Sequence, residues 1–125
     1  MWTDDWVGIP YRELGRGPDF DCLGLFVALQ LERHGREIFD PICSMQTAAL
    51  QRLADRVRPN WRKVPAASAG AAVLFRVRGL ALHVGYAVDA SRMLHTSQET
   101  GESVIENYKT PVWGDRLEGV YEYRG

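Results

Sequence analysis

Three side chains in this sequence are of the types that carry out thiol-based acyl transfer: Cys22, His83 and His95. In that chemistry a cysteine sulfur attacks a carbonyl carbon, an imidazole takes the thiol proton, and a third polar group orients the imidazole. The chain presents these types in the order cysteine, histidine, polar residue, with the second histidine twelve residues after the first. The pattern predicts a nucleophile, a base and an orienting group.

A helix predicted over residues 22–34 positions the cysteine. Asp21 is a suitable N-cap and Gly35 a suitable stop, and the apolar stripe between them recurs at helical spacing through Cys22, Leu25, Phe26 and Leu29. Cys22 therefore falls in the first turn, on the side that faces the core. Unpaired amides and the helix dipole favour negative charge there, so we expect a lowered thiol pKa.

The two histidines lie on segments predicted as neighbouring strands, residues 82–88 and 93–96. If the loop between them has three or five residues, directly opposed residues have numbers that sum to 180. His95 then faces Gly85 and lies diagonal to His83 on the same sheet face, roughly 7 to 8 Å away between backbones. A two-residue loop would place the rings on opposite faces. The segment lacks the Asn-Gly or Asp-Gly signal of that shorter turn, which favours the longer loop.

The rest of the chain gives the fold class. A second helix is expected over residues 44–58, followed by a strand over 72–77 and a turn at 78–79. Weaker strand signals follow at 103–106 and 119–123. Helices followed by strands with short polar breaks predict an α+β fold, with N-terminal helices packed on an antiparallel sheet. Residues 1–125 have the length and composition of one domain.

Composition and charge exclude several classes of function. The formal net charge of −1 gives no broad footprint for nucleic acid, and no apolar run is long enough to span a membrane. No export signal is visible, so we expect synthesis in the cytoplasm with reduced thiols. The second cysteine, Cys43, lacks a helix-start setting and is expected to be structural.

Motifs spread over nearly the whole chain resemble the NlpC-type cell-wall peptidases, and within them the short phage-tail and prophage versions. The matching segments are Gly8-Ile9-Pro10-Tyr11, Gly17-Pro18-Asp19-Phe20-Asp21-Cys22-Leu23-Gly24-Leu25, Leu82-His83-Val84-Gly85-Tyr86-Ala87-Val88 and Met93-Leu94-His95. Trp113 with Arg116, and the terminal Gly119-Val120-Tyr121, are similar to the tail of the phage group.

The resemblance implies a papain-like NlpC-type fold and a cysteine peptidase that cuts peptidoglycan stem peptides, usually at the γ-D-glutamyl-diaminopimelate bond. It assigns Cys22 as nucleophile, His83 as base and His95 as the group that orients His83. The backbone N–H of Cys22 would meet the oxyanion, with Tyr11 lining the same wall, and no metal or organic cofactor is implied. Its partners would be the stem peptide and phage-tail proteins, with a particle or host machinery delivering the enzyme to the wall.

Two positions depart from the family pattern. Gly70-Ala71 stands where the family usually has Gly-Asp ahead of a strand, and we expect this change to affect stability modestly and not catalysis. The other departure follows the nucleophile. Many members have serine after the nucleophile, where this chain has Leu23. In some members that serine helps to hold the free amine of the first stem alanine, so a requirement for such an amine is in doubt here.

Three other functions use the same residues. A papain-like acyltransferase or amidase would keep the triad and change the acceptor. A non-catalytic tail or wall-binding module would carry a decayed site. A zinc site built from Cys22, His83 and His95 would lack the paired ligand spacing that is typical of structural zinc.

Overall fold

The computed structural model describes residues 1–40, 56, 58–77 and 81–125. The predicted helix that carries the cysteine is present as α1, Cys22–His34. The Asp21 carboxylate caps it by accepting from the Gly24 N–H at 2.7 Å, and Gly35 ends it with a left-handed φ of 65°. Both predicted ends are confirmed, because each depends on a capping residue next to the helix.

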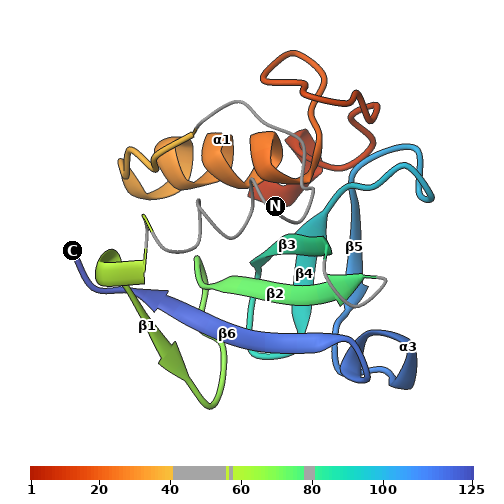
Figure 1. Cartoon of the computed structure of the whole chain (residues 1–125). Helices are drawn as coiled ribbons and strands as arrows, with labels where there is room; N and C mark the ends of the chain where they lie inside the picture. The colour runs from red at the N-terminus through yellow and green to blue at the C-terminus, as the bar shows by residue number, and fades with distance from the viewer. Residues whose placement is uncertain (41–55, 57, 78–80) are drawn as a thin grey trace.

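The strands form one antiparallel sheet in the order β1-β6-β2-β3-β4-β5 (Figure 1). Their bounds are β1 Trp61–Val64, β2 Ala72–Val77, β3 Ala81–Ala87, β4 Arg92–His95, β5 Val104–Asn107 and β6 Leu117–Tyr123. Strands β2 to β5 pair in sequence order, whereas β6 returns to pair with β2 on one side and β1 on the other. The strands predicted from the sequence are confirmed to within two residues at either end, and β1 is an addition to them.

The pairing of β3 with β4 has the predicted register. Tyr86 faces Leu94 and Ala87 faces Met93, so the numbers of opposed residues sum to 180. The Val88 N–H also donates to the Arg92 carbonyl at 2.8 Å, which closes a three-residue loop. This register carries both histidines on the same face of the sheet.

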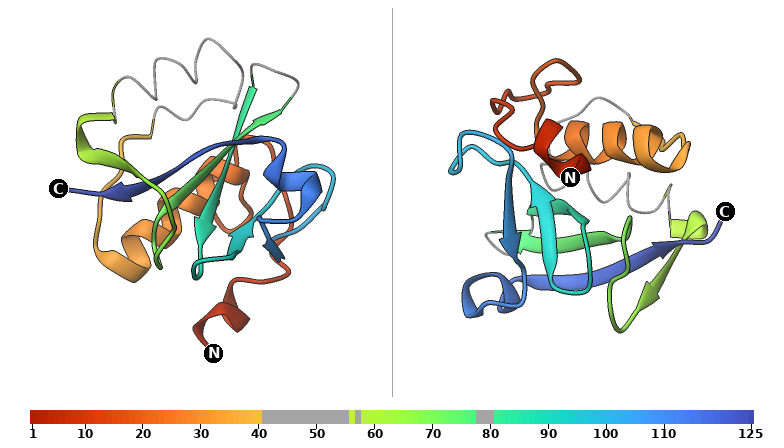
Figure 2. Two further views of the ribbon diagram at one scale, coloured as in Figure 1. Left: turned by 90° about the horizontal axis from the view of Figure 1, so that it is seen from below. Right: turned by 180° about the vertical axis from the view of Figure 1, so that it is seen from behind.

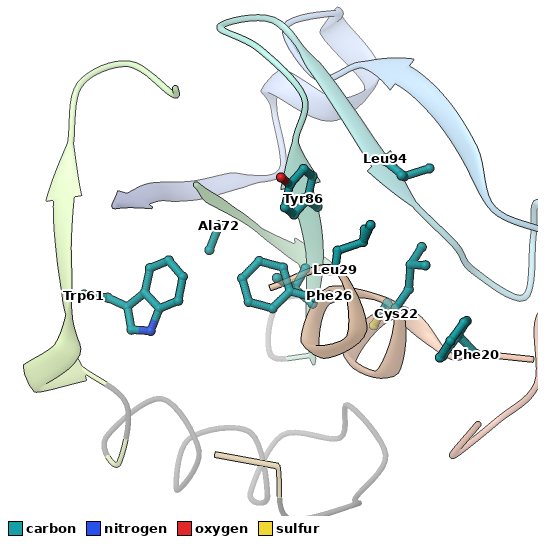
Figure 3. Packing of buried hydrophobic residues seen from close by; sticks show 10 residues of the cluster. Phe20, Cys22, Phe26, Leu29, Trp61, Ala72, Tyr86 and Leu94 are labelled. Carbon is teal, nitrogen blue, oxygen red and sulfur yellow. The ribbon is translucent and has the colours of Figure 1, made fainter. Parts of the chain in front are cut away.

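Each face of the sheet has its own hydrophobic cluster. Between α1 and the sheet, Cys22, Phe26 and Leu29 pack against Tyr86 and Leu94 (Figure 3). The opposite face is covered by a second cluster of buried residues, consisting of Ala67, Ala71, Val73, Phe75, Ala87, Met93, Tyr108 and Val120. The short helix α3, Pro111–Gly114, lies on the side of the sheet away from α1 (Figure 2). The sheet therefore separates two packed layers.

The expectation of N-terminal helices packed on the sheet is matched in the described residues by α1 alone. Within residues 1–40 the structure has one α-helix, α1, preceded by a short 3-10 turn over Trp2–Asp5 and a loop. The loop holds Pro10, Pro18 and several glycines, which do not support helix. The turn predicted at 78–79 lies outside the described residues. The helix predicted over 44–58 also lies outside them, except for residues 56 and 58. Among the described helices, none has the length and apolar character needed to cross a bilayer.

Candidate active site

The two histidines of the sheet form a hydrogen-bonded pair. The distance from Nε2 of His83 on β3 to Nδ1 of His95 on β4 is 2.7 Å, and both rings are buried. Gly85 lies between them in register, and a Cβ there would come within 2.7 Å of Sδ of Met93. The predicted juxtaposition of the rings is confirmed, because an antiparallel register that sums to 180 makes the two positions diagonal neighbours.

Two further residues complete this face of the site, and the sequence interpretation did not assign either to it. Nε2 of His95 lies 2.5 Å from Oε2 of Glu106 on β5. The indole of Trp113, from α3, stacks on His83 at 5.5 Å between centroids and meets His95 edge-on at 5.2 Å. Glu106 faces Met93 across the β4–β5 ladder, which makes it diagonal to His95. The weak strand signal at 103–106 was the only sequence feature that could have placed it there.

The Cys22 thiol lies at the edge of β3 beside the histidine pair. It accepts from the backbone N–H of Val84, the residue that follows His83. The β3–β4 ladder covers Tyr86–Leu94 and Ala87–Met93 and ends before Val84, which leaves this N–H for the sulfur. The first turn of α1 therefore places the sulfur against the peptide that joins His83 to Val84.

The Cys22 sulfur contacts the backbone beside His83 and not the His83 ring. His83 lies on the sheet face that carries Phe75 and Trp113, whereas α1 covers the other face. Among the hydrogen bonds of the described residues, none joins the Cys22 thiol to a nitrogen of His83. Because Nε2 of His83 is bonded to His95, Nδ1 is the ring nitrogen left for the thiol.

The electrostatic state of the pair differs from the sequence expectation. Burial raises the pKa of the Cys22 thiol to about 12, against the opposing effect of the Val84 and Leu23 amides. Burial also lowers the pKa of His83 to about 3, with the neighbouring His95 contributing. The prediction of a lowered thiol pKa is therefore wrong, because loss of solvent outweighs the helix N-terminus. The resting site holds a neutral thiol and a neutral imidazole.

The start of α1 is fixed by an ion-paired loop. Arg16 donates to Asp21 at 2.8 Å and to Asp40 at 2.6 Å, so one guanidinium ties the N-cap to the chain beyond the helix. Gly24 allows the loop to approach, since a Cβ there would come within 2.1 Å of the Gly15 carbonyl oxygen. These contacts position Cys22 without touching its sulfur.

Tyr11 is half-buried, and its phenol is near enough to Cys22 for the two groups to interact electrostatically. Its backbone N–H donates to the Gly101 carbonyl at 2.9 Å, and an isolated bridge pairs it with Phe20. Burial raises the pKa of the Tyr11 phenol, and the nearby Asp21 carboxylate and the ionised form of Cys22 would raise it further. The backbone N–H of Cys22, at the first position of α1, belongs to the helix-start amides that lack intrahelical partners.

The histidine pair is poorly suited to hold a metal ion. Both ring nitrogens of His95 are already hydrogen-bonded, one to His83 and the other to Glu106. Within the described part of the chain, no three histidine, cysteine, aspartate or glutamate side chains are grouped as metal ligands would be. The arrangement is better suited to proton transfer than to coordination.

The fold and site define an α+β protein with a helix-start cysteine beside a strand-borne histidine pair, and comparisons with known proteins agree. A model of the NlpC/P60 family matches residues 8–122. The chain therefore belongs to the NlpC/P60 family. No curated protein matches it significantly.

Three solved structures share the fold. An NLP/P60-family protein similar to lipoprotein from Staphylococcus aureus subsp. aureus Mu50 has a TM-score of 0.70 and 20% identity, covering 97% of this chain and 38% of that one. An NlpC/P60 family protein from Bacillus cereus ATCC 10987 has a TM-score of 0.71 and 22% identity, and the match covers 97% of this chain and 37% of that one. The NlpC/p60 domain of the peptidoglycan hydrolase SagA has a TM-score of 0.66 and 20% identity, and the match covers 96% of this chain and 92% of that one. This chain spans well under half of the first two proteins.

Proposed function

We propose that this protein is a cysteine peptidase that hydrolyses amide bonds in the stem peptides of bacterial peptidoglycan. The observation that carries the proposal is the contact of the Cys22 sulfur with the Val84 amide, directly beside a hydrogen-bonded His83–His95 pair. Membership of the NlpC/P60 family and the likeness to a domain of a peptidoglycan hydrolase support the choice of substrate.

The proposed reaction begins from the neutral pair. The Cys22 sulfur forms a bond to the substrate carbonyl carbon while its proton moves to Nδ1 of His83. The backbone N–H of Cys22 donates to the oxyanion, and Tyr11 lines the same wall. Protonated His83 then gives its proton to the amine nitrogen as the C–N bond breaks. Water, losing its proton to His83, hydrolyses the thioester and restores the thiol.

Formation of the thiol–imidazole contact belongs to substrate binding in this proposal. Catalytic hydrogen bonds are often long or poorly aligned in a free enzyme and tighten in the substrate complex. The sulfur is held at the His83–Val84 peptide, and in this proposal substrate binding brings Nδ1 of His83 to it.

The bond cut is proposed to be the γ-D-glutamyl-diamino acid bond, without a requirement for a free stem-peptide amine. The residue after the nucleophile is Leu23, which has no polar side-chain atom and is only 4% exposed. It therefore offers no hydroxyl to an alanine amine. Stem peptides with and without an acetylated first amine should be cut at similar rates.

The test is digestion of purified muropeptides, followed by mass spectrometry of the new amines. Wild type should release them, Cys22→Ala should not, and Cys43→Ser, which removes the other thiol of the chain, should retain activity. Equal release by wild type and Cys22→Ala would refute the peptidase. Binding of both proteins to cell walls without release would instead favour a non-catalytic wall-binding module.

A phage or prophage tail setting is the biological context that we propose. The supporting features are Trp113, which stacks on His83, and Arg116, whose guanidinium lies 5.7 Å from the Trp113 ring centroid. These are the residues through which the chain resembles the phage group. Tail genes beside the gene for this protein would support that setting, and a chromosomal neighbourhood without phage genes would contradict it.

A further inference from the structure

Glu106 extends the histidine pair into a row of three hydrogen-bonded groups. Its carboxylate lies 2.5 Å from Nε2 of His95, whose Nδ1 lies 2.7 Å from Nε2 of His83. The side chain of Glu106 is 39% exposed, whereas that of His95 is 0% exposed. The row therefore runs from a solvent-facing charge on β5 to a buried ring on β3, with one strand between them.

The chemistry of these groups fixes where each ring proton lies. A carboxylate can only accept a hydrogen bond, so the proton of the Glu106–His95 bond must be on Nε2 of His95. Neutral His95 then has a lone pair on Nδ1, and the proton of the second bond must be on Nε2 of His83. This leaves Nδ1 of His83 with a lone pair, which is the form that a general base requires.

We propose that Glu106 is a positioning residue that sets the tautomers of both histidines and thereby keeps Nδ1 of His83 unprotonated. The tautomer assignment stands on the hydrogen bonds alone, while its catalytic consequence rests on the proposed function. Without an acceptor at residue 106, His95 is free to carry its proton on Nδ1 and donate to His83. The proton of His83 would then lie on Nδ1, and the base would be blocked.

The negative charge also supports the second half of the reaction. When His83 takes the thiol proton, the new positive charge is shared along its bond to His95. A carboxylate on the far side of His95 favours that charged state more than a neutral group would. Trp113 covers both rings and keeps water from supplying the same stabilisation.

Ring ¹⁵N NMR of the labelled protein near neutral pH tests the proposal. Wild type should show both histidines with protonated Nε2 and unprotonated Nδ1. Glu106→Gln can turn its amide oxygen to His95 and should keep these tautomers, whereas Glu106→Ala should lose them. Glu122→Gln removes an exposed carboxylate on β6, which pairs with Arg62 at 3.4 Å, and should leave the ring signals unchanged.

Muropeptide cleavage gives the second readout. Glu106→Ala should lower kcat about 10- to 100-fold with little change in KM, by analogy with the loss caused by removing the hydrogen-bond partners of metal-ligating histidines. Glu106→Gln should recover part of that loss, and Glu122→Gln should match wild type. Unchanged histidine tautomers in folded Glu106→Ala would overturn the proposal. If wild type itself cleaves nothing, the peptidase proposal fails, and the NMR result still decides the role of Glu106.

Discussion

Acid should destabilise this protein through His83. Burial holds the pKa of His83 at about 3, whereas an unfolded histidine has a pKa of about 6.5. Between these values the unfolded state binds a proton that the folded state does not. The free energy of unfolding therefore has its full value above pH 6.5 and falls as the pH falls toward 3.

The size of the effect follows from the difference between the two pKa values. At pH 5, about 1.5 pH units below the unfolded pKa, protonation stabilises the unfolded state by roughly 2 kcal/mol. The loss in the free energy of unfolding approaches about 5 kcal/mol near pH 3. Asp89 titrates outside the assay window, because hydrogen bonds from Ser91 and Arg92 hold its pKa at about 2.

Urea denaturation at pH 7 and pH 5, followed by tryptophan fluorescence, measures the loss. His83→Gln provides the comparison, because its amide can donate to His95 but takes up no proton in this range. Wild type should lose about 2 kcal/mol more than the variant between the two pH values. The contributions of His34 and His95, whose pKa values burial also lowers, remain in both proteins. Equal losses in the two proteins would refute this account of His83.

Two further predictions concern the helix that carries the cysteine. Since burial raises the pKa of Cys22 to about 12, iodoacetamide should label it slowly near pH 8 and faster only in more alkaline solution, as measured by mass spectrometry of Cys43→Ser protein. Rapid labelling near pH 7 would contradict that pKa. Gly24→Ala should lower the free energy of unfolding by about 1 to 3 kcal/mol, since the new methyl would overlap a backbone carbonyl. Gly114→Ala, with its nearest contact at 3.9 Å, should change it by less than about 1 kcal/mol in urea titration, and equal effects would contradict the packing argument.

Local signals in the sequence were sufficient for the elements that carry the predicted residues. Asp21 and Gly35 define both ends of α1, because capping depends on residues within a turn of the helix end. The short polar loop after β3 fixed the register that brings His83 to His95, since a hairpin register follows from its own loop length. Each of these features depends on neighbours in sequence.

Contacts between distant segments decided the rest. Glu106 meets His95 only through the β4–β5 ladder, and Trp113 reaches His83 only because α3 lies against the second face of the sheet. The ionisation of Cys22 was decided in the same way. Its place at a helix start is local and favours the thiolate, but its burial against β3 is not local and raises the pKa. Desolvation depends on everything that surrounds a group, so only the folded chain determines it.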